Sequence, residues 1–380
     1  MIDNWVKKGL VIAVIILFIC MCINPSFAVD NIKKSSMSVS SGNILYVGGS
    51  GPGNYTRIQD AIDNASVGDT VFVFDDSSPY YECLFLNKTI SLVGEDKDTT
   101  IIDGNKSIDV IGITANNVRI SRFTVQNSGI NQYDTGIKFI NGNYCTISSC
   151  IITNNKVGLC FEGVKNNTII NCTVVNNYNG ILFKNEINEL NKILNCTIRG
   201  NSYIGVQFEH ILLFHRLNVI NGNIISNNQV GIAMITSESN EITNNLICNN
   251  SVCGIAIETC MVGCDNQMIY YNNFINNSQH ASDKGQNTWY NAETKKGNYW
   301  DDYRGKDILP PYGIGDMPYK ISGDLHNRDW YPLMQPYPKT YNNQASRIQS
   351  ITQQSSSQQS SNNQNLFVSL LLKQMTKANK

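Results

Sequence analysis

Three charged residues occupy matching positions of a repeated phrase: Glu162, Lys184 and Glu209 each follow a phenylalanine. If the phrase stacks as coils of parallel strands, Glu162 and Glu209 lie two coils apart, about 9–10 Å. That separation is close to the carboxylate spacing of an inverting glycosidase, so the two glutamates are candidate catalytic residues. Lys184 between them supports the alternative of a solvated ladder of alternating charge. We prefer the ladder, because sugar hydrolases usually bring several carboxylates together.

A second possible chemistry is metal binding, because copper and related ions take imidazole or thiolate ligands. His210 and His215 share one long corner of the repeat, and Cys260 and Cys264 share another. Neither pair has the spacing of a known ligand motif. Ordinary corner histidines and a loop disulfide are the preferred alternatives.

The element that must position these residues is the phrase itself, which is clearest over residues 167–183. Each copy ends with a glycine followed by alternating apolar residues, and successive glycines are 22 to 26 residues apart. These glycines are Gly136, Gly158, Gly180, Gly205, Gly231 and Gly254. A period of this length indicates stacked supersecondary units, none of which can bury its apolar face alone.

The apolar residues within a copy alternate with period two in short runs, as in Ile181 and Phe183, which predicts strands rather than helices. Three short strands with tight corners fit into one copy only if the copy makes one turn of a coil. We therefore predict an all-β fold, a right-handed parallel β-helix of roughly nine or ten coils.

Asparagine and glycine suit the corners, because both tolerate the left-handed backbone conformation. Equivalent asparagines should also stack and hydrogen-bond along the axis. One expected column contains Asn167, Asn191, Asn218 and Asn240, and a second contains Asn223, Asn245 and Asn272. The second continues as Cys196, Cys172 and Cys150, which we expect to be buried thiols, since in-register cysteines stand too far apart for a relaxed disulfide.

Composition changes divide the chain into five parts. Residues 1–28 carry Lys7 and Lys8, an apolar run and a small-residue cleavage site, which predicts an export signal, with an uncleaved anchor as the alternative. Residues 29–43 are a polar linker, and residues 44–334 are the β-helix with its end caps. Residues 335–365 are a Gln/Ser/Asn-rich segment expected to be disordered. Residues 366–380 form an apolar-basic tail, for which docking to a partner or membrane surface is a possible role.

Each end of the solenoid should be covered. Tyr55–Ala65 is expected to form a short N-terminal capping helix, with Thr56 and Gln59 at capping-box spacing. Residues 286–334 are rich in tyrosine and tryptophan and are expected to form the C-terminal cap. The net charge of −1 and 42% hydrophobic content describe an ordinary globular chain and give no basic field for nucleic acid.

The cap supplies the most specific resemblance. Residues 297–303 (GNYWDDY), 313–319 (GIGDMPY) and 329–334 (DWYPLM) resemble the end of NosD-type proteins, exported β-helix proteins named for copper maturation of nitrous-oxide reductase. The resemblance covers about residues 44–334 and implies fold and export more firmly than copper. Residues 55–59 are also similar to the start of pectin-esterase β-helices, without that family's later catalytic segments.

Our leading hypothesis is an exported, non-catalytic scaffold at the cell surface or in the periplasm, which binds polysaccharide or another surface protein. Its expected ligand-binding residues are Lys138, Glu162, Lys184 and Glu209, on one exposed face. One alternative is a copper-binding accessory protein for metalloenzyme maturation. Another is a polysaccharide lyase or glycoside hydrolase.

Overall fold

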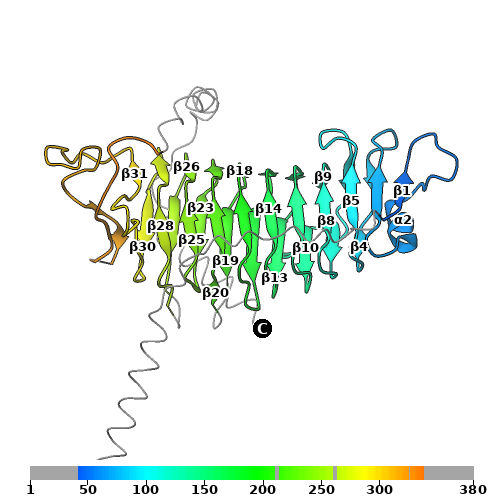
Figure 1. Ribbon diagram of the computed structural model, residues 1–380, viewed down its shortest axis with the longest axis horizontal. Helices are drawn as coiled ribbons and strands as arrows, with labels where there is room; N and C mark the ends of the chain where they lie inside the picture. The colour runs from blue at the N-terminus through cyan, green and yellow to red at the C-terminus, as the bar shows by residue number, and fades with distance from the viewer. Residues whose placement is uncertain (1–41, 210–213, 260–262, 325, 338–380) are drawn as a thin grey trace, which may run out of the picture. The chain divides into compact units, whose positions relative to one another are not determined.

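Each repeat folds into three short strands, and equivalent strands of successive repeats pair in parallel to form three ten-stranded sheets (Figure 1). The structure is a computed structural model that describes residues 42–209, 214–259, 263–324 and 326–337. Its architecture confirms the right-handed parallel β-helix of about ten turns. The chain passes from the first sheet to the second and third and then returns to the first, one coil further on.

The first sheet, called sheet A, contains β1 (Ile44–Val47), β2 (Thr70–Val73), β5 (Ser91–Gly94), β8 (Arg119–Ser121), β11 (Thr146–Ser148), β14 (Thr168–Ile170), β17 (Lys192–Leu194), β21 (Val219–Asn221), β25 (Glu241–Thr243) and β28 (Met268–Tyr270). Sheet B contains β3 (Tyr80–Tyr81), β6 (Ile101–Asp103), β9 (Thr124–Gln126), β12 (Ile151–Thr153), β15 (Thr173–Val175), β18 (Thr197–Arg199), β22 (Ile224–Ser226), β26 (Leu246–Cys248), β29 (Asn273–Ile275) and β31 (Tyr299–Trp300).

Sheet C carries the longest strands and the charged face predicted from the sequence. It contains β4 (Leu84–Leu86), β7 (Ile111–Ile113), β10 (Thr135–Ile140), β13 (Val157–Glu162), β16 (Asn179–Lys184), β19 (Ile204–Glu209), β23 (Val230–Met234), β27 (Cys253–Ile257), β30 (Ala281–Asp283) and β33 (Ser322–Gly323). Two small pairs lie outside the three sheets, namely β20 (His215–Arg216) with β24 (Ser237–Glu238), and β32 (Tyr319–Lys320) with β34 (Arg328–Asp329).

The core is a set of aligned side-chain columns running along the solenoid axis. Phe139, Phe161, Phe183 and Phe208 pair in register on sheet C and have no exposed surface. Their rings stack with centroids 4.5–4.7 Å apart. Because the coil spacing equals a favourable ring-stacking distance, one residue type can repeat at this position without strain.

The corners hold the predicted asparagine columns. The backbone N–H of Asn167 donates to Oδ1 of Asn191 at 3.0 Å, and that of Asn191 donates to Asn218 in the same way. The second column is also present, with Asn223 donating to Asn245 and Asn245 to Asn272. Cys150, Cys172 and Cys196 continue it as buried free thiols, as expected.

A third amide column, which we did not predict as a column, lines the corner between sheets B and C. Its members are Asn155, Asn177, Asn201, Asn228, Asn250 and Asn277. Each ladder residue follows a residue with positive φ, such as Asn176 (φ 57°) before Asn177. The Asn-Asn pairs therefore divide two tasks: the first asparagine takes the left-handed turn and the second forms the ladder.

The repeated glycines of sheet C serve close packing rather than the corner. Gly158 lies inside β13 and is not among the positive-φ residues. A Cβ atom built on it would lie 2.5 Å from the carbonyl oxygen of Gly180 in the next coil. Glycine is required here because the adjacent coil leaves no room for a side chain.

The helix α2 (Ile58–Asn64) packs on the first coils through Ile58, Ala61 and Ile62, which are buried. The predicted capping box is wrong, because the N-cap residue is Arg57 and it makes no side-chain cap hydrogen bond. Instead the carboxylate of Glu82, from the turn before β4, accepts the N–H groups of Ile58 and Gln59 at 2.8 and 3.0 Å. Among the described residues, no helix is both long and apolar enough to span a membrane.

The ladder predicts a specific order of stability among variants of Asn245, which has no exposed surface. Its Oδ1 accepts the N–H of Asn223 at 2.9 Å, and its Nδ2 donates to the carbonyl of Ile220 at 2.8 Å. Asn245→Ala leaves these buried groups unpaired, so we expect a loss of roughly 2–4 kcal/mol in unfolding free energy.

The matched control is Asn245→Cys. In the same column, Sγ of Cys196 donates to the carbonyl of Ile169, so a cysteine retains the donor but not the acceptor. We expect Asn245→Cys to be destabilised less than Asn245→Ala in denaturant unfolding followed by circular dichroism. Equal stability of wild type and both variants would contradict the importance of the ladder.

Candidate functional site

The charged column of sheet C is in the predicted register. Ile140 pairs with Glu162, Glu162 with Lys184, and Lys184 with Glu209. Lys184 therefore stands between the two carboxylates, one coil from each. Lys138 lies two residues before Ile140 and reaches the column diagonally.

Lys184 does not lie on an exposed face, contrary to the expectation from sequence, because only 7% of its surface is exposed. Its Nζ lies 3.5 Å from the ring centroid of Tyr133, which comes from the loop before β10. A cation that has lost most of its hydration is stabilised by the face of an aromatic ring and by the adjacent carboxylates. This loop lies outside the repeat pattern, so alternation alone could not reveal the covering ring.

The two glutamates have different surroundings. Burial raises the pKa of Glu209, and the charge of Lys184 acts against this shift. Nε2 of Gln207 also donates to the carboxylate of Glu209 at 3.0 Å. Glu162 is half-buried and accepts a hydrogen bond from the amide of Asn185.

Lys138 links the column to the preceding coil. Its Nζ lies 3.3 Å from Asp109 and 3.9 Å from Glu162. Burial alone would lower the pKa of Lys138, but Asp109 and the other nearby anionic groups together raise it. Lys138 is thus paired with carboxylates of the coils on either side of it.

Two tyrosines stand just before strands of sheet C, at the strand ends opposite Lys184 and Glu209. Tyr178 and Tyr203, in adjacent coils, stack with centroids 5.3 Å apart. Nζ of Lys156 lies 3.6 Å above the ring of Tyr178, which is half-buried. A lysine and two stacked aromatic rings from three successive coils therefore lie in a row at this edge.

Of the residues considered as metal ligands from the sequence, His210 and Cys260 lie outside the described residues. His215 has no exposed surface, and its Nδ1 accepts the N–H of Asn188 at 3.4 Å while Nε2 lies 3.3 Å from the carbonyl of Glu209. Cys264 is a free, buried thiol whose Sγ lies 3.2 Å from Oγ of Ser237, so the expected loop disulfide is not formed. Neither residue presents an unused ligand atom to solvent.

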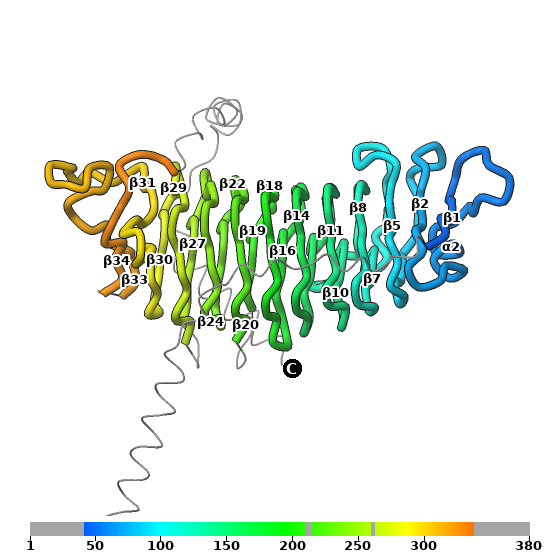
Figure 2. Tube along the Cα trace, viewed as in Figure 1, coloured from blue at the N-terminus to red at the C-terminus, as the bar shows by residue number. Residues whose placement is uncertain are grey.

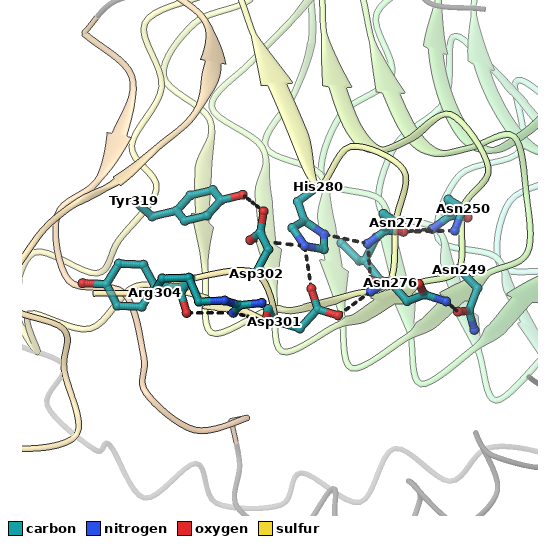
Figure 3. Close-up of polar contacts among 11 residues, drawn as sticks. Asn249, Asn250, Asn276, Asn277, His280, Asp301, Asp302, Arg304 and Tyr319 are labelled. Carbon is teal, nitrogen blue, oxygen red and sulfur yellow. Dashed lines mark hydrogen bonds and ion pairs between the residues drawn. The ribbon is translucent and has the colours of Figure 1, made fainter. Parts of the chain in front are cut away.

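A different group converges at the C-terminal end of the solenoid. His280 lies in the turn before β30, and Asp301 and Asp302 follow β31 one coil later (Figure 3). Nε2 of His280 is 2.7 Å from Oδ1 of Asp301 and 3.4 Å from Oδ1 of Asp302. Among the described residues, these three form the one group of three or more His, Cys, Asp or Glu residues whose ligand atoms all lie within 4.8 Å of one another.

The carboxylates of this cluster are held by further donors. Burial pushes the pKa of Asp301 upward, but hydrogen bonds from His280 and from the N–H of Asn276 outweigh it and hold the pKa below its usual value. The hydroxyl of Tyr319 donates to Asp302 at 3.2 Å. His280 itself has only 4% of its side chain exposed.

The third amide ladder fixes the tautomer of His280. Oδ1 of Asn277 accepts from Nδ2 of Asn250 at 2.8 Å, and Nδ2 of Asn277 donates to the carbonyl of Ile247 at 2.9 Å. The remaining hydrogen of that amide is directed to Nδ1 of His280, 3.3 Å away, so Nδ1 acts as the acceptor (Figure 3). Nε2 then carries the proton that it donates to Asp301.

Sequence reasoning missed this cluster, although a signal existed. His280 lies three residues after the last asparagine of a ladder, and the two aspartates lie in the cap phrase one coil further on. Placing them together requires knowing that the strand before the aspartates stacks on the strand before the histidine turn.

The comparisons with known proteins agree with this fold. The model of the family described as periplasmic copper-binding protein (NosD) matches residues 62–305. A search of curated proteins finds no match. The crystal structure of pectate lyase Pel9A is similar, with TM-score 0.50 and 16% identity, over 69% of this chain and 75% of that chain. The ORF18 protein of Geobacillus virus E2 also has TM-score 0.50 and 16% identity, over 70% of this chain and 64% of its own.

At such identity the two solved structures establish a shared fold and nothing further. The family match is stronger evidence, because it runs from within helix α2 to residue 305 and includes all strands from β2 to β31. It therefore spans more than half of the sequence, and the chain belongs to the NosD family.

Proposed function

We propose that this NosD-family protein is an exported, non-catalytic scaffold that binds polysaccharide along the outer side of sheet C. The observation that carries the proposal is the position of Lys184, in register between Glu162 and Glu209. This position argues for the non-catalytic part of the proposal, because the side chain of Lys184 takes the space that hydrolysis would need between the two carboxylates.

An inverting glycosidase keeps a gap between its two carboxylates, in which a water molecule attacks the sugar. Here the Lys184 side chain fills the gap, and the ring of Tyr133 lies over its Nζ. A retaining enzyme would need the two carboxylates closer together than two coils allow. Glu162 and Glu209 therefore suit a charge ladder better than an acid–base pair.

The surface beside the ladder has the chemistry of sugar recognition. The ring of Tyr178 is half-buried between Lys156 and Tyr203, so it can offer its edge and its hydroxyl group to a sugar. Lys138 and Glu162 have 18% and 27% of their side chains exposed and can hydrogen-bond to hydroxyl or carboxylate groups. Because these groups come from three successive coils, an extended polymer is a better match than a small molecule.

Copper is implied by the family description, so the fit of the His280 cluster must be considered. A metal ion at Nε2 would require the proton to move to Nδ1, where it would face the amide hydrogens of Asn277. Histidines that ligate metals instead direct their second N–H at a carbonyl or carboxylate. The cluster as arranged therefore suits a hydrogen-bonded group that terminates the third asparagine column, and it does not suit a copper site.

Export is the second part of the proposal. It is supported by the basic and apolar composition of residues 1–28 and by membership of a family described as periplasmic. A cell-surface or periplasmic location would place the scaffold where polysaccharide is available.

The polysaccharide proposal is tested by affinity electrophoresis of the purified protein in gels containing acidic or neutral polysaccharides. We expect retardation by at least one acidic polymer, because cationic and aromatic groups lie together on this side, and a loss of most of it in Tyr178→Ala. The matched control is Tyr144→Ala, since Tyr144 is a 55% exposed tyrosine elsewhere on the solenoid.

Equal retardation of Tyr178→Ala and wild type would contradict this binding surface. Capture of a specific surface protein without any polysaccharide binding would replace the ligand class. Product release that falls in Glu162→Gln and Glu209→Gln would instead establish an enzyme.

The tautomer of His280 gives a separate prediction on metal binding. Nitrogen-15 NMR of the imidazole should show the Nε2–H form, and titration with Cu(II) should reveal no submicromolar site that depends on Asp301 or Asp302. Submicromolar binding that disappears in Asp301→Asn with Asp302→Asn would contradict the ladder-end interpretation and favour the copper accessory function. Asp324→Asn is the control, since Asp324 binds the exposed His326 at 2.9 Å.

Export predicts a defined mature N-terminus. Expression in a native-like host should yield protein in the exported fraction, and Edman sequencing should begin near residue 29 if the signal is cleaved after Ala28. Retention of the full-length chain in the cytoplasm would contradict export, whereas a membrane-bound chain that keeps residues 1–28 would identify an anchor.

A further inference from the structure

The outer face of sheet C carries an exposed aromatic ring near the helix α2. Phe85 lies in the middle of β4, between Leu84 and Leu86, and is 49% exposed. Strands β4 and β7 lie at the α2 end of the solenoid (Figures 1 and 2). Leu84 and Leu86 are buried in the core, so the alternation of the strand itself turns the ring of Phe85 toward solvent.

The next strand leaves room for this ring. Gly112 of β7 pairs with Phe85, and Lys138 of β10 pairs with Gly112 on the other side. A Cβ atom built on Gly112 would lie 3.4 Å from Cδ2 of Phe85, so one edge of the ring lies over the glycine. Phe85 and Lys138 are therefore two coils apart, about 9–10 Å, with no side chain between them.

The backbone that carries the ring is fixed by α2. Sheet C ends at β4, and Oε1 of Gln59 accepts the N–H of Phe85 at 2.9 Å. Nε2 of Gln59 donates to the carbonyl of Phe85 at 3.4 Å. One amide thus takes the place of a further strand at this position. A ring on such a fixed backbone is already in place before a ligand binds, which reduces the entropic cost of binding.

Three charged side chains lie further along the same face. Nζ of Lys138 is 3.3 Å from Asp109 and 3.9 Å from Glu162, and the three side chains are 18%, 26% and 27% exposed. Oδ1 of Asp109 accepts the N–H of Thr135 at 2.7 Å, and Oε1 of Glu162 accepts the amide of Asn185. Both carboxylates are therefore held in position while part of their surface stays open to solvent.

We propose that Phe85, Asp109, Lys138 and Glu162 form a subsite for a neutral hexopyranose residue. This inference rests on the polysaccharide proposal and names one kind of sugar within it. The C–H groups on one face of a pyranose ring can pack on the exposed ring of Phe85. Its hydroxyl groups can donate to the carboxylates, which only accept hydrogen bonds.

The charges favour a neutral sugar over an acidic one at this subsite. Lys138 is the ammonium group of the set, and it is shared between Asp109 and Glu162. A uronic acid would bring a third carboxylate to the same cation, and like charges placed side by side weaken binding. A hydroxyl group meets no such repulsion.

This subsite and the tyrosine row are separate places on the same sheet. Tyr178 precedes β16, which is four strands from β4, or about 19 Å. Different residues of one polymer would therefore contact the two places. A heteropolysaccharide with both acidic and neutral residues suits the whole face.

The test is affinity electrophoresis of the full chain in gels containing galactomannan or hydroxyethylcellulose, which are neutral, or polygalacturonate, which is acidic. We expect retardation by at least one neutral polymer, with a dissociation constant about tenfold or more higher in Phe85→Ala and little changed in Phe85→Tyr. The matched control is Tyr81→Ala, because Tyr81 is a 67% exposed aromatic residue on sheet B and should leave binding unchanged.

Gly112→Val tests the position of the ring without removing it. Gly112 is not among the positive-φ residues, and the nearest atoms to a Cβ built there are at ordinary contact distance, so the variant should fold. The branched side chain would displace the ring of Phe85, and we expect the same loss of neutral-polymer binding as in Phe85→Ala. Circular dichroism of each variant checks the fold.

The outcomes separate this subsite from the polysaccharide proposal. Absence of retardation of wild type by every polymer would overturn both. Neutral-polymer binding that is equal in wild type and Phe85→Ala would overturn the subsite and leave the wider proposal standing. The subsite would also be overturned by wild-type binding to acidic polymers alone, or by a loss in Tyr81→Ala as large as that in Phe85→Ala.

Discussion

The hydrogen bond from a corner N–H to the asparagine oxygen of the next coil is the interaction on which the rest of the structure depends. Each turn buries backbone groups that strands cannot pair, and an unpaired buried N–H is costly. The side chain of Asn177, for example, accepts the N–H of Asn155 and donates to the carbonyl of Ile152. One amide therefore satisfies a donor and an acceptor in the preceding coil, which fixes the vertical register of the whole solenoid.

In each ladder the N–H of one coil donates to the asparagine of the following coil, so the last coil needs an acceptor of another kind. The N–H of the last asparagine has no further amide to receive it, so a stronger acceptor takes its place. The N–H of Asn298 donates to Asp329 at 2.7 Å, and Nε1 of Trp300 reaches the same oxygen at 2.9 Å. Burial raises the pKa of Asp329 to about 7 despite these donors. His215 and His280 also serve as acceptors at the end of an asparagine column, because Nδ1 of each ring lies within hydrogen-bond distance of an asparagine N–H.

The sequence was sufficient for what repeats. The glycine period, the alternation ending in Phe161 and Phe183, and the columns through Asn167 and Asn223 all follow from one coil being copied onto the next. The sequence was insufficient where a segment outside the repeat packs over a strand of the repeat. The loop that carries Tyr133 turns Lys184 from an expected surface charge into a covered one, and no periodicity in the chain specifies where that loop packs. The His280 cluster was missed for the same reason, because its histidine and aspartates belong to the irregular last coils.

Function in such a molecule should therefore be sought at departures from the repeat. A regular coil presents the same few side chains at every level, so its columns select residues for stacking and satisfied hydrogen bonds. Cys172 shows how little the residue type at such a position can vary. It occupies an asparagine position of the second column, and its thiol still donates to the carbonyl of Ile147. Lys184, by contrast, stands between the two glutamates of its column, and the loop containing Ile308 and Leu309 breaks the rule that apolar side chains turn inward. Lys184 is accommodated within the chain by the Tyr133 ring and the two flanking carboxylates, whereas the outward apolar side chains of the second departure do not improve the packing of the core.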